Sequence, residues 1–274
     1  MFELNSIYYP ITALPDAQNN SYIEVPPCNA LRPYVRCFWG TSQPIRNCEK
    51  QGRPVIPDTC MDIIFETNYS KNEYVGSFLA LDEGSYNAVI IDNTDTVSTF
   101  AIRFYAWSAV LFSDNSMKNS KNLYFDADEF FHGLQKEFEP FLCSKTSFSQ
   151  KIKAAEQILM NRINLNKFSD NLMNGLYHII KNNGNVKISD ICDYTGLSKK
   201  TLERVFNENM GITPKSIQSL IRYQLLWQDI YSHKHFDVFD AVLKYGYFDQ
   251  AHLLNDFKRR HSMTPNAALM LALG

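Results

Sequence analysis

Basic and polar side chains near the C-terminus have the types and the spacing that reading a DNA duplex requires. Lys200, Glu203 and Arg204 stand three and four residues apart, so they share one face if the segment is a helix. An arginine can bind guanine through two hydrogen bonds, and a glutamate can accept one from cytosine. We therefore predict base contacts for these three side chains. Further contacts are predicted for Lys187 and Lys199, as phosphate anchors, and for Ser198.

A second group of the same kind follows nearer to the C-terminus. The candidates for base edges are Gln250, His252 and Asn255. The residues expected beside the phosphate backbone are Lys258, Arg259 and Arg260. The alternative for any single member of either group is an ordinary solvated side chain.

Two copies of one short design are expected to position these side chains, at residues 187–214 and 236–265. The endings of the copies align at an offset of 51 residues. The aligned pairs are Leu202 with Leu253, Phe206 with Phe257, Thr213 with Thr264, and Pro214 with Pro265. A repeat of this length that ends twice in Thr-Pro indicates duplicated structural units.

Each copy has the pattern of a helix, a tight turn and a second helix. In the first copy Gly196 supplies the turn, and Ser198 is the expected N-cap of the second helix. Gly246 and Asp249 occupy the same places in the second copy. A short helix, a glycine turn and a helix with a polar, cationic outer face form the helix-turn-helix that enters a major groove.

A long helix is predicted between the two copies. Residues 214–232 begin at a Thr-Pro signal and contain no further Gly or Pro. About 18 helical residues span roughly 27 Å, and neighbouring major grooves on one side of a duplex are ~34 Å apart. One chain is thus expected to place two recognition helices in successive grooves.

At these residues the sequence resembles the AraC/XylS family of bacterial transcription regulators, over roughly residues 171–273. The second unit of that family typically reads Gly-Phe-x-Asp, then Phe, then Gly-x-Thr-Pro. Here it stands as Gly246-Tyr247-Phe248-Asp249, then Phe257, then Ser262-Met263-Thr264-Pro265. The positions that depart from the family pattern are Cys192, Val242, Ala251 and Ser262. The resemblance implies double-stranded DNA and RNA polymerase as partners. A homodimer and a role as an activator are the expectations, with a monomer and a repressor as the alternatives that stay open.

The distribution of charge agrees with this interpretation but is not sufficient evidence for it. The 274-residue chain has a formal charge of −2 and is 45% hydrophobic, which favours two domains. Residues 181–274 hold 12 Lys and Arg against 9 Asp and Glu, whereas 15 and 20 precede them. A basic C-terminal part behind an acidic N-terminal part fits local docking to DNA.

The first 125 residues have the texture of short strands separated by Pro, Gly, Asn and Asp. The predicted strands are 22–25, 34–39, 61–66, 74–78, 86–91 and 97–103. The fragments 32–40, 57–66 and 101–107 resemble the N-terminal halves of some AraC-like proteins, which implies a cupin-like β-barrel or sandwich. The predicted fold is therefore α+β, with this barrel and flanking helices followed by an all-α domain of two helix-turn-helix units joined by a long helix.

Three parts of the chain follow from this division: 1–125 as a regulatory domain, 126–165 as a helical linker, and 166–274 as the DNA-binding domain. The linker carries apolar residues three and four apart, among them Phe130, Leu134 and Phe138. This stripe is expected either to form a dimer contact, as the family implies, or to pack on its own barrel. Both alternatives stay open at this point.

Aromatic residues in the N-terminal strands suggest a pocket for a small organic effector. The residues predicted to line it are Trp39, Asp62, Arg103 and Trp107, with Asp62 or Arg103 fixing a polar end of the ligand. Aromatic side chains are also ordinary core filling in a small barrel, so the core interpretation stands beside the pocket interpretation.

Several function classes are excluded by missing patterns. The sequence has no Gly-x-Ser-x-Gly, His-Glu-x-x-His or Gly-rich phosphate loop, and the N-terminal strands contain no histidine, so neither an enzyme nor a metal site is expected. The six cysteines lack Cys-x-x-Cys spacing and are expected to be small hydrophobes, with no cofactor. The start of the chain does not have a signal-peptide pattern, and no apolar run is long enough for a membrane span, which predicts a cytoplasmic protein.

The sequence thus predicts a sequence-specific DNA-binding transcription regulator whose N-terminal domain senses a small molecule. The alternative is a DNA-binding regulator that oligomerisation or a protein partner controls, with no small-molecule ligand. Effector, operator and regulated genes are not encoded in any pattern of this one sequence.

Overall fold

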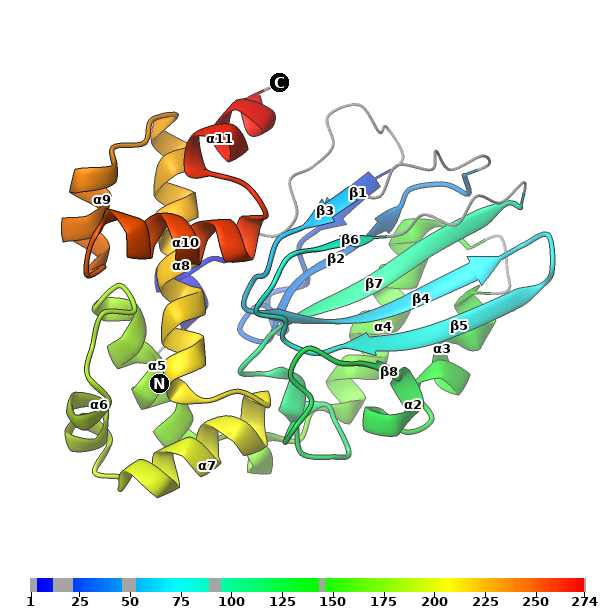
Figure 1. Ribbon diagram of the computed structural model, residues 1–274. Helices are drawn as coiled ribbons and strands as arrows, with labels where there is room; N and C mark the ends of the chain where they lie inside the picture. The colour runs from blue at the N-terminus through cyan, green and yellow to red at the C-terminus, as the bar shows by residue number, and fades with distance from the viewer. Residues whose placement is uncertain (1–3, 12–21, 46–52, 89–94, 143–145, 274) are drawn as a thin grey trace.

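A computed structural model describes residues 4–11, 22–45, 53–88, 95–142 and 146–273. It consists of a β-rich N-terminal domain and a helical C-terminal domain that lie against each other (Figure 1). The predicted α+β class, with the sheet first and the helix-turn-helix units second, is confirmed.

Antiparallel strands form one large sheet and one small ribbon in the N-terminal domain. The large sheet has the order β1-β2-β7-β4-β5-β8, and the ribbon pairs β3 with β6. The bounds are β1 Tyr22–Val25, β2 Val35–Thr41, β3 Arg53–Val55, β4 Cys60–Asn68, β5 Glu73–Leu79, β6 Tyr86–Ala88, β7 Val97–Tyr105 and β8 Tyr124–Asp126. All six predicted strands are present, although 89–91 of the fifth lie outside the described residues. The three-residue strands β3 and β8 were not predicted.

Three helices pack on the large sheet and account for the apolar stripe of the linker region. They are α2 Ala127–Phe130, α3 Leu134–Leu142 and α4 Phe148–Arg162. The ring of Phe138 stacks on Phe65 at 4.8 Å and on Phe100 at 5.1 Å between ring centroids. The stripe therefore buries itself on its own sheet, and nothing about it requires a second copy of the chain. The homodimer stays a prediction.

The C-terminal domain is built from the two repeated units around one long helix. Its helices are α5 Asp170–Lys181, α6 Ile188–Thr195, α7 Lys199–Met210, α8 Pro214–His233, α9 Val238–Tyr245, α10 Gln250–His261 and α11 Pro265–Leu273. Short elements elsewhere are α1 Leu4–Ile7, η1 Ala109–Leu111 and η2 Leu165–Lys167. No helix of the described residues is long and apolar enough to cross a membrane.

The central helix α8 also joins the two domains. Gln224 is fully buried, and its side-chain amide donates to the carbonyl of Pro57 at 2.8 Å and of Ile11 at 3.1 Å. The Ile11 amide donates back to its oxygen at 2.9 Å. One turn further on, Gln228 donates to the carbonyl of Tyr9. Because buried amides must be paired, these bonds fix α8 against the N-terminal segment.

The N-terminal domain touches the C-terminal ends of α7 and α10, the second helix of each unit. It does so through two loops, residues 82–85 and 117–122, which we call the contact loops. The amide of Met117 donates to the carbonyl of Glu208 in α7 at 2.9 Å. The hydroxyls of Ser85 and Ser262 are hydrogen-bonded just after α10. The contact loops are joined to each other by the ion pair of Lys121 with Glu83. Both helix ends are thus held from the same side.

Two glycines allow a matched test of this contact. Gly211 and Gly196 both have left-handed backbone, with φ of 69° and 68°. An added Cβ would meet the Met117 carbonyl at 2.6 Å and the Ser120 hydroxyl at 2.5 Å at Gly211, but nothing within 4 Å at Gly196.

Gly196→Ala should therefore lower the free energy of unfolding by the left-handed penalty alone, about 1–2 kcal/mol. Gly211→Ala should lower it further, because the contact loop must also move. Urea unfolding of the two variants measures the difference, and equal losses would contradict a tight contact at Gly211.

Candidate nucleic-acid interface

The helix α7 presents one apolar face to the core and one polar face to solvent. Its start is capped by Ser198, whose hydroxyl accepts from the amide of Thr201 at 3.2 Å. Leu202 and Phe206 are fully buried. Because these two residues are four apart, they fix the rotation of the helix and leave the opposite face free for a partner.

The predicted contact residues of the first unit lie on this outer face. Lys199, Lys200, Glu203 and Arg204 are exposed, as are Ser198 and, before α6, Lys187. The side chain of Arg204 is 62% exposed, and its guanidinium pairs with Glu208 at 3.1 Å. An exposed pair of this kind contributes little stability, so Arg204 can exchange it for a base at small cost.

The helix α10 repeats the arrangement in the second unit. Asp249 caps its start by accepting from the amide of His252 at 2.7 Å, and Leu253 and Phe257 are fully buried. The predicted contact residues that are exposed are Gln250, His252, Asn255, Lys258 and Arg259.

Two of these side chains already have partners within the unit, and one further predicted contact residue is buried. The imidazole of His252 lies edge-on to Tyr247, with ring centroids 5.3 Å apart. Arg259 pairs with the buried carboxylate of Asp256 at 2.7 Å. Arg260, expected beside the DNA backbone, is fully buried, so that expectation is wrong. Gln250, Asn255 and Lys258 are the side chains of this face that remain most available to DNA.

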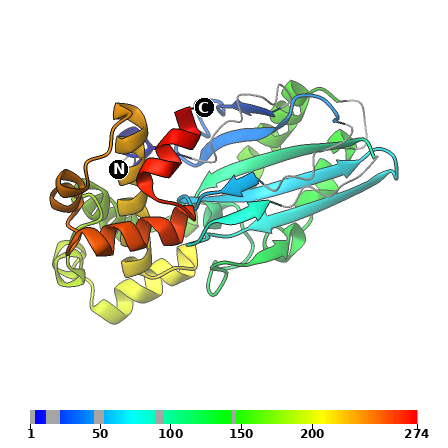
Figure 2. The same cartoon turned by 45° about the horizontal axis from the view of Figure 1, so that its top comes forward.

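The two recognition helices lie across α8 at different levels along it in both views (Figures 1 and 2). α8 has 20 residues, which corresponds to about 30 Å. This length is close to the ~34 Å between successive major grooves on one side of a duplex.

A cavity of about 340 Å³ lies at one end of the large sheet. Its polar lining includes Asp58, Asp62 and Arg103. Arg103 binds Asp62 through two hydrogen bonds of 2.7 and 2.6 Å. The Trp39 indole also donates to Asp62, at 3.3 Å. Three of the four predicted ligand residues thus come together.

Trp39 does not itself line this cavity but is hydrogen-bonded to Asp62, which does. Trp107, the fourth predicted residue, does not line the cavity either. Its ring stacks on Tyr105 at 4.7 Å between centroids and lies 6.4 Å from Tyr8. The core interpretation therefore fits Trp107, whereas the pocket interpretation fits the group around Arg103.

The hydrogen-bonding capacity of Arg103 is incompletely used within the described residues. Its Nη1 atom has no hydrogen-bond partner among the described residues, and the nearest carboxylate oxygen of Asp58 is 3.8 Å away. Burial raises the pKa of the Asp58 carboxyl to about 6, although Arg103 acts in the opposite direction. A buried donor without an acceptor is costly, so this corner can accept a polar group or a water.

Among the described residues, no group of His, Cys, Asp and Glu side chains is arranged to hold a metal ion. Of the cysteines, Cys37 and Cys60 are buried, and Cys28 and Cys192 are partly buried. Cys48 and Cys143 lie outside the described residues.

Sequence reasoning missed the residues that join the domains. Gln224 looked like one more member of the long helix, and the contact loops carried no motif. Arg260 had a usable signal, because it stands seven residues after Leu253 and three after Phe257. That spacing places it on the inward face of α10.

Comparisons with known proteins agree with the architecture. Residues 191–269 match a family described as a helix-turn-helix domain, and residues 23–126 match a domain of unknown function (DUF6597). No curated protein matches the chain. The first match confirms that the repeated units form a helix-turn-helix domain.

Solved structures of ToxT from Vibrio cholerae are also similar to this chain. ToxT of strain O395 has 12% sequence identity and a TM-score of 0.40, over 93% of this chain and 100% of that one. ToxT of strain SCE256 with bound unsaturated fatty acid has 10% identity and a TM-score of 0.39, over 92% and 96%.

Asp58→Asn should remove a pH dependence of folding. The folded-state pKa of Asp58 is about 6, above its ordinary value of 3.8. Its contribution to stability is therefore complete below about pH 4 and is lost as the pH rises through 6. The stability of the variant relative to the parent should increase across this window. Thermal unfolding between pH 4 and 8 measures it, with the exposed Asp128→Asn as control, and a difference that does not change with pH would contradict it.

Proposed function

We propose that this chain, a member of the AraC/XylS family of transcription regulators, reads two successive major grooves of a DNA duplex and responds to a small molecule. The observation that supports DNA reading is the pair of capped helices α7 and α10, each with its apolar face buried and its polar face exposed. Binding by two units would give a bipartite operator with centres about one helical turn apart.

The roles proposed for the exposed side chains follow from their chemistry. Lys200, Glu203 and Arg204 in α7 would contact base edges, as would Gln250, His252 and Asn255 in α10. The phosphate contacts would come from Lys187, Lys199, Lys258 and Arg259. Ser198 would add a contact from the start of α7, where the helix dipole favours an anion.

The cavity around Arg103 supports the small-molecule part of the proposal. It combines apolar walls with a few buried polar groups, the usual composition of a ligand site. Nη1 of Arg103 has no hydrogen-bond acceptor within the part of the chain that the structure describes, and the neighbouring Asp58 offers an oxygen to a donor. A ligand that carries a hydroxyl or a similar donor–acceptor group would satisfy both.

Control by a protein partner is the second candidate, and the apolar surface of the second unit favours it. Leu243 in α9 and Phe248 in the following turn are 82% and 90% exposed, and Phe239 is 64% exposed. Phe239 and Leu243 are four residues apart and share one face of α9, and an exposed apolar face commonly marks a protein contact. RNA polymerase as partner, activation of transcription and a homodimer belong to this part of the proposal.

Arg204→Ala should weaken binding to the preferred site by roughly 1–3 kcal/mol and relax the choice of one base pair. Lys199→Ala should weaken binding to preferred and scrambled duplexes alike and should flatten the salt dependence. Selection from random duplexes at two salt concentrations would supply the preferred site, and titrations would then compare the variants. Equal losses on both duplexes for Arg204→Ala would remove it from base recognition.

A metabolite that binds the cavity should raise the thermal stability of the chain. At a hundredfold excess over Kd the gain is ~2.7 kcal/mol. Arg103→Met should abolish the gain, because the ligand loses its polar anchor, whereas Trp107→Phe, outside the cavity, should retain it. Thermal shifts with a metabolite library test this. A gain that survives in Arg103→Met but not in Trp107→Phe would place the ligand elsewhere, and no gain from any compound would favour control by a partner.

A further inference from the structure

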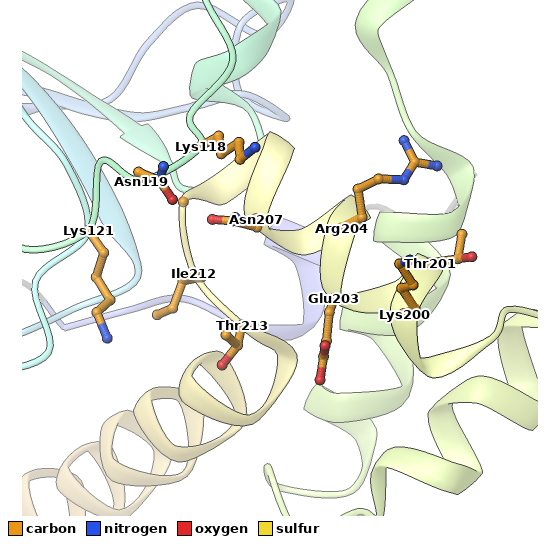
Figure 3. Close-up of a pocket in the computed structure, with 11 residues that line it drawn as sticks. Lys118, Asn119, Lys121, Lys200, Thr201, Glu203, Arg204, Asn207, Ile212 and Thr213 are labelled. Carbon is orange, nitrogen blue, oxygen red and sulfur yellow. The ribbon is translucent and has the colours of Figure 1, made fainter.

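A groove of about 740 Å³ lies between the outer face of α7 and the contact loop 117–122. In Figure 3 the loop residues Lys118, Asn119 and Lys121 lie on one side of it, and Lys200, Glu203 and Arg204 on the other. The face of α7 that is proposed to read DNA is therefore bordered by the N-terminal domain. This arrangement has no counterpart in the sequence patterns, because the two sides are about eighty residues apart in the chain.

The loop is held firmly beside α7. The amide of Met117 donates to the Glu208 carbonyl at 2.9 Å, and the Ser120 hydroxyl donates to the carbonyl of Met117 at 2.7 Å. Both Met117 and Ser120 are fully buried. Since the backbone at Gly211 also packs against them, Lys118 keeps a defined position relative to the recognition face.

The charges of the groove suit an anionic polymer. Lys118 is exposed, and no ion pair within the described residues holds its ammonium group. Lys121 is partly neutralised by Glu83 at 2.5 Å. Across the groove, Lys200 and Arg204 supply two further cations, of which Arg204 is paired with Glu208, and Glu203 contributes a carboxylate to the lining.

We propose that Lys118, a residue of the N-terminal domain, binds a DNA phosphate on the strand that borders the major groove read by α7. A recognition helix contacts bases mainly with its N-terminal residues, so its C-terminal part lies near the sugar-phosphate backbone. Met117 contacts α7 at Glu208, in its last turn. The loop is thus on the side where a phosphate strand would pass.

This inference rests on the proposed DNA binding by α7 and adds a second domain to the interface. Phosphate contacts set the position of a protein on the duplex and carry no sequence information. Lys118 is therefore expected to strengthen binding to every sequence. A further consequence is that full affinity requires the two domains to be packed as they are here.

The test is the salt dependence of DNA binding by the full chain carrying Lys118→Ala. Loss of one phosphate contact should reduce the slope of log K against log salt by about 0.9. At 0.1 M salt the affinity should fall roughly three- to tenfold on preferred and scrambled duplexes alike. The matched control is Lys136→Ala, because Lys136 is also an exposed lysine of the N-terminal domain but lies on α3. Thermal unfolding would verify that both variants fold.

Two results would overturn the inference. A Lys118→Ala slope equal to that of Lys136→Ala would show that the loop does not touch DNA. Tighter binding of Lys118→Ala would show that the loop obstructs the recognition face. Arg204→Ala in the same assay separates this inference from the proposed function. If that variant loses its base preference while Lys118→Ala is silent, DNA reading stands and only the loop contact fails.

Discussion

The packing of the second recognition helix depends on one fully buried guanidinium. Arg260 donates to the carboxylate of Asp256 at 3.4 Å, to the Ser219 hydroxyl at 2.8 Å and to the Glu83 carbonyl at 3.1 Å. A buried charge is tolerated only when it is paired and hydrogen-bonded. Because these partners lie in α10, in α8 and in the N-terminal domain, their requirement to meet at one point sets how the three parts of the molecule fit together.

The contact loops connect this interface to the cavity. Asp82 and Asn122 line the cavity, and the Asn122 side chain accepts from the amide of Glu83 at 3.0 Å. Pro57 also lines the cavity, and its carbonyl accepts from Gln224 of α8. A ligand changes the position of such loops only by the difference of its affinity for two arrangements. A ligand in the cavity would act on both helices, because the walls of the cavity are the same backbone segments that hold α8 and α10.

Local signals were sufficient to predict the C-terminal domain, and long-range signals were needed for the rest. Ser198, Asp249 and the glycines of the turns act within a few residues of chain, so their roles could be predicted from spacing. The cluster around Arg103 was partly predictable, since strand neighbours recur at regular intervals. Only the folded chain shows that Asp58 lines the cavity and that Trp107 packs on Tyr105 instead. Gln224 bonds to Ile11, 213 residues away, and no periodicity within α8 distinguishes that partner from solvent.

The acidic N-terminal domain is compatible with DNA binding because electrostatic effects are local under physiological conditions. The Debye length is about 10 Å at 0.1 M salt, so exposed charges further apart than this are largely screened. A phosphate strand bound at α7 as proposed would sense the immediate border of the groove, which Lys118, Lys200 and Arg204 line. The formal charge of −2 is then no obstacle. Placement of a few cations by buried contacts, such as the amide of Met117 on Glu208, matters more than the sum over the chain.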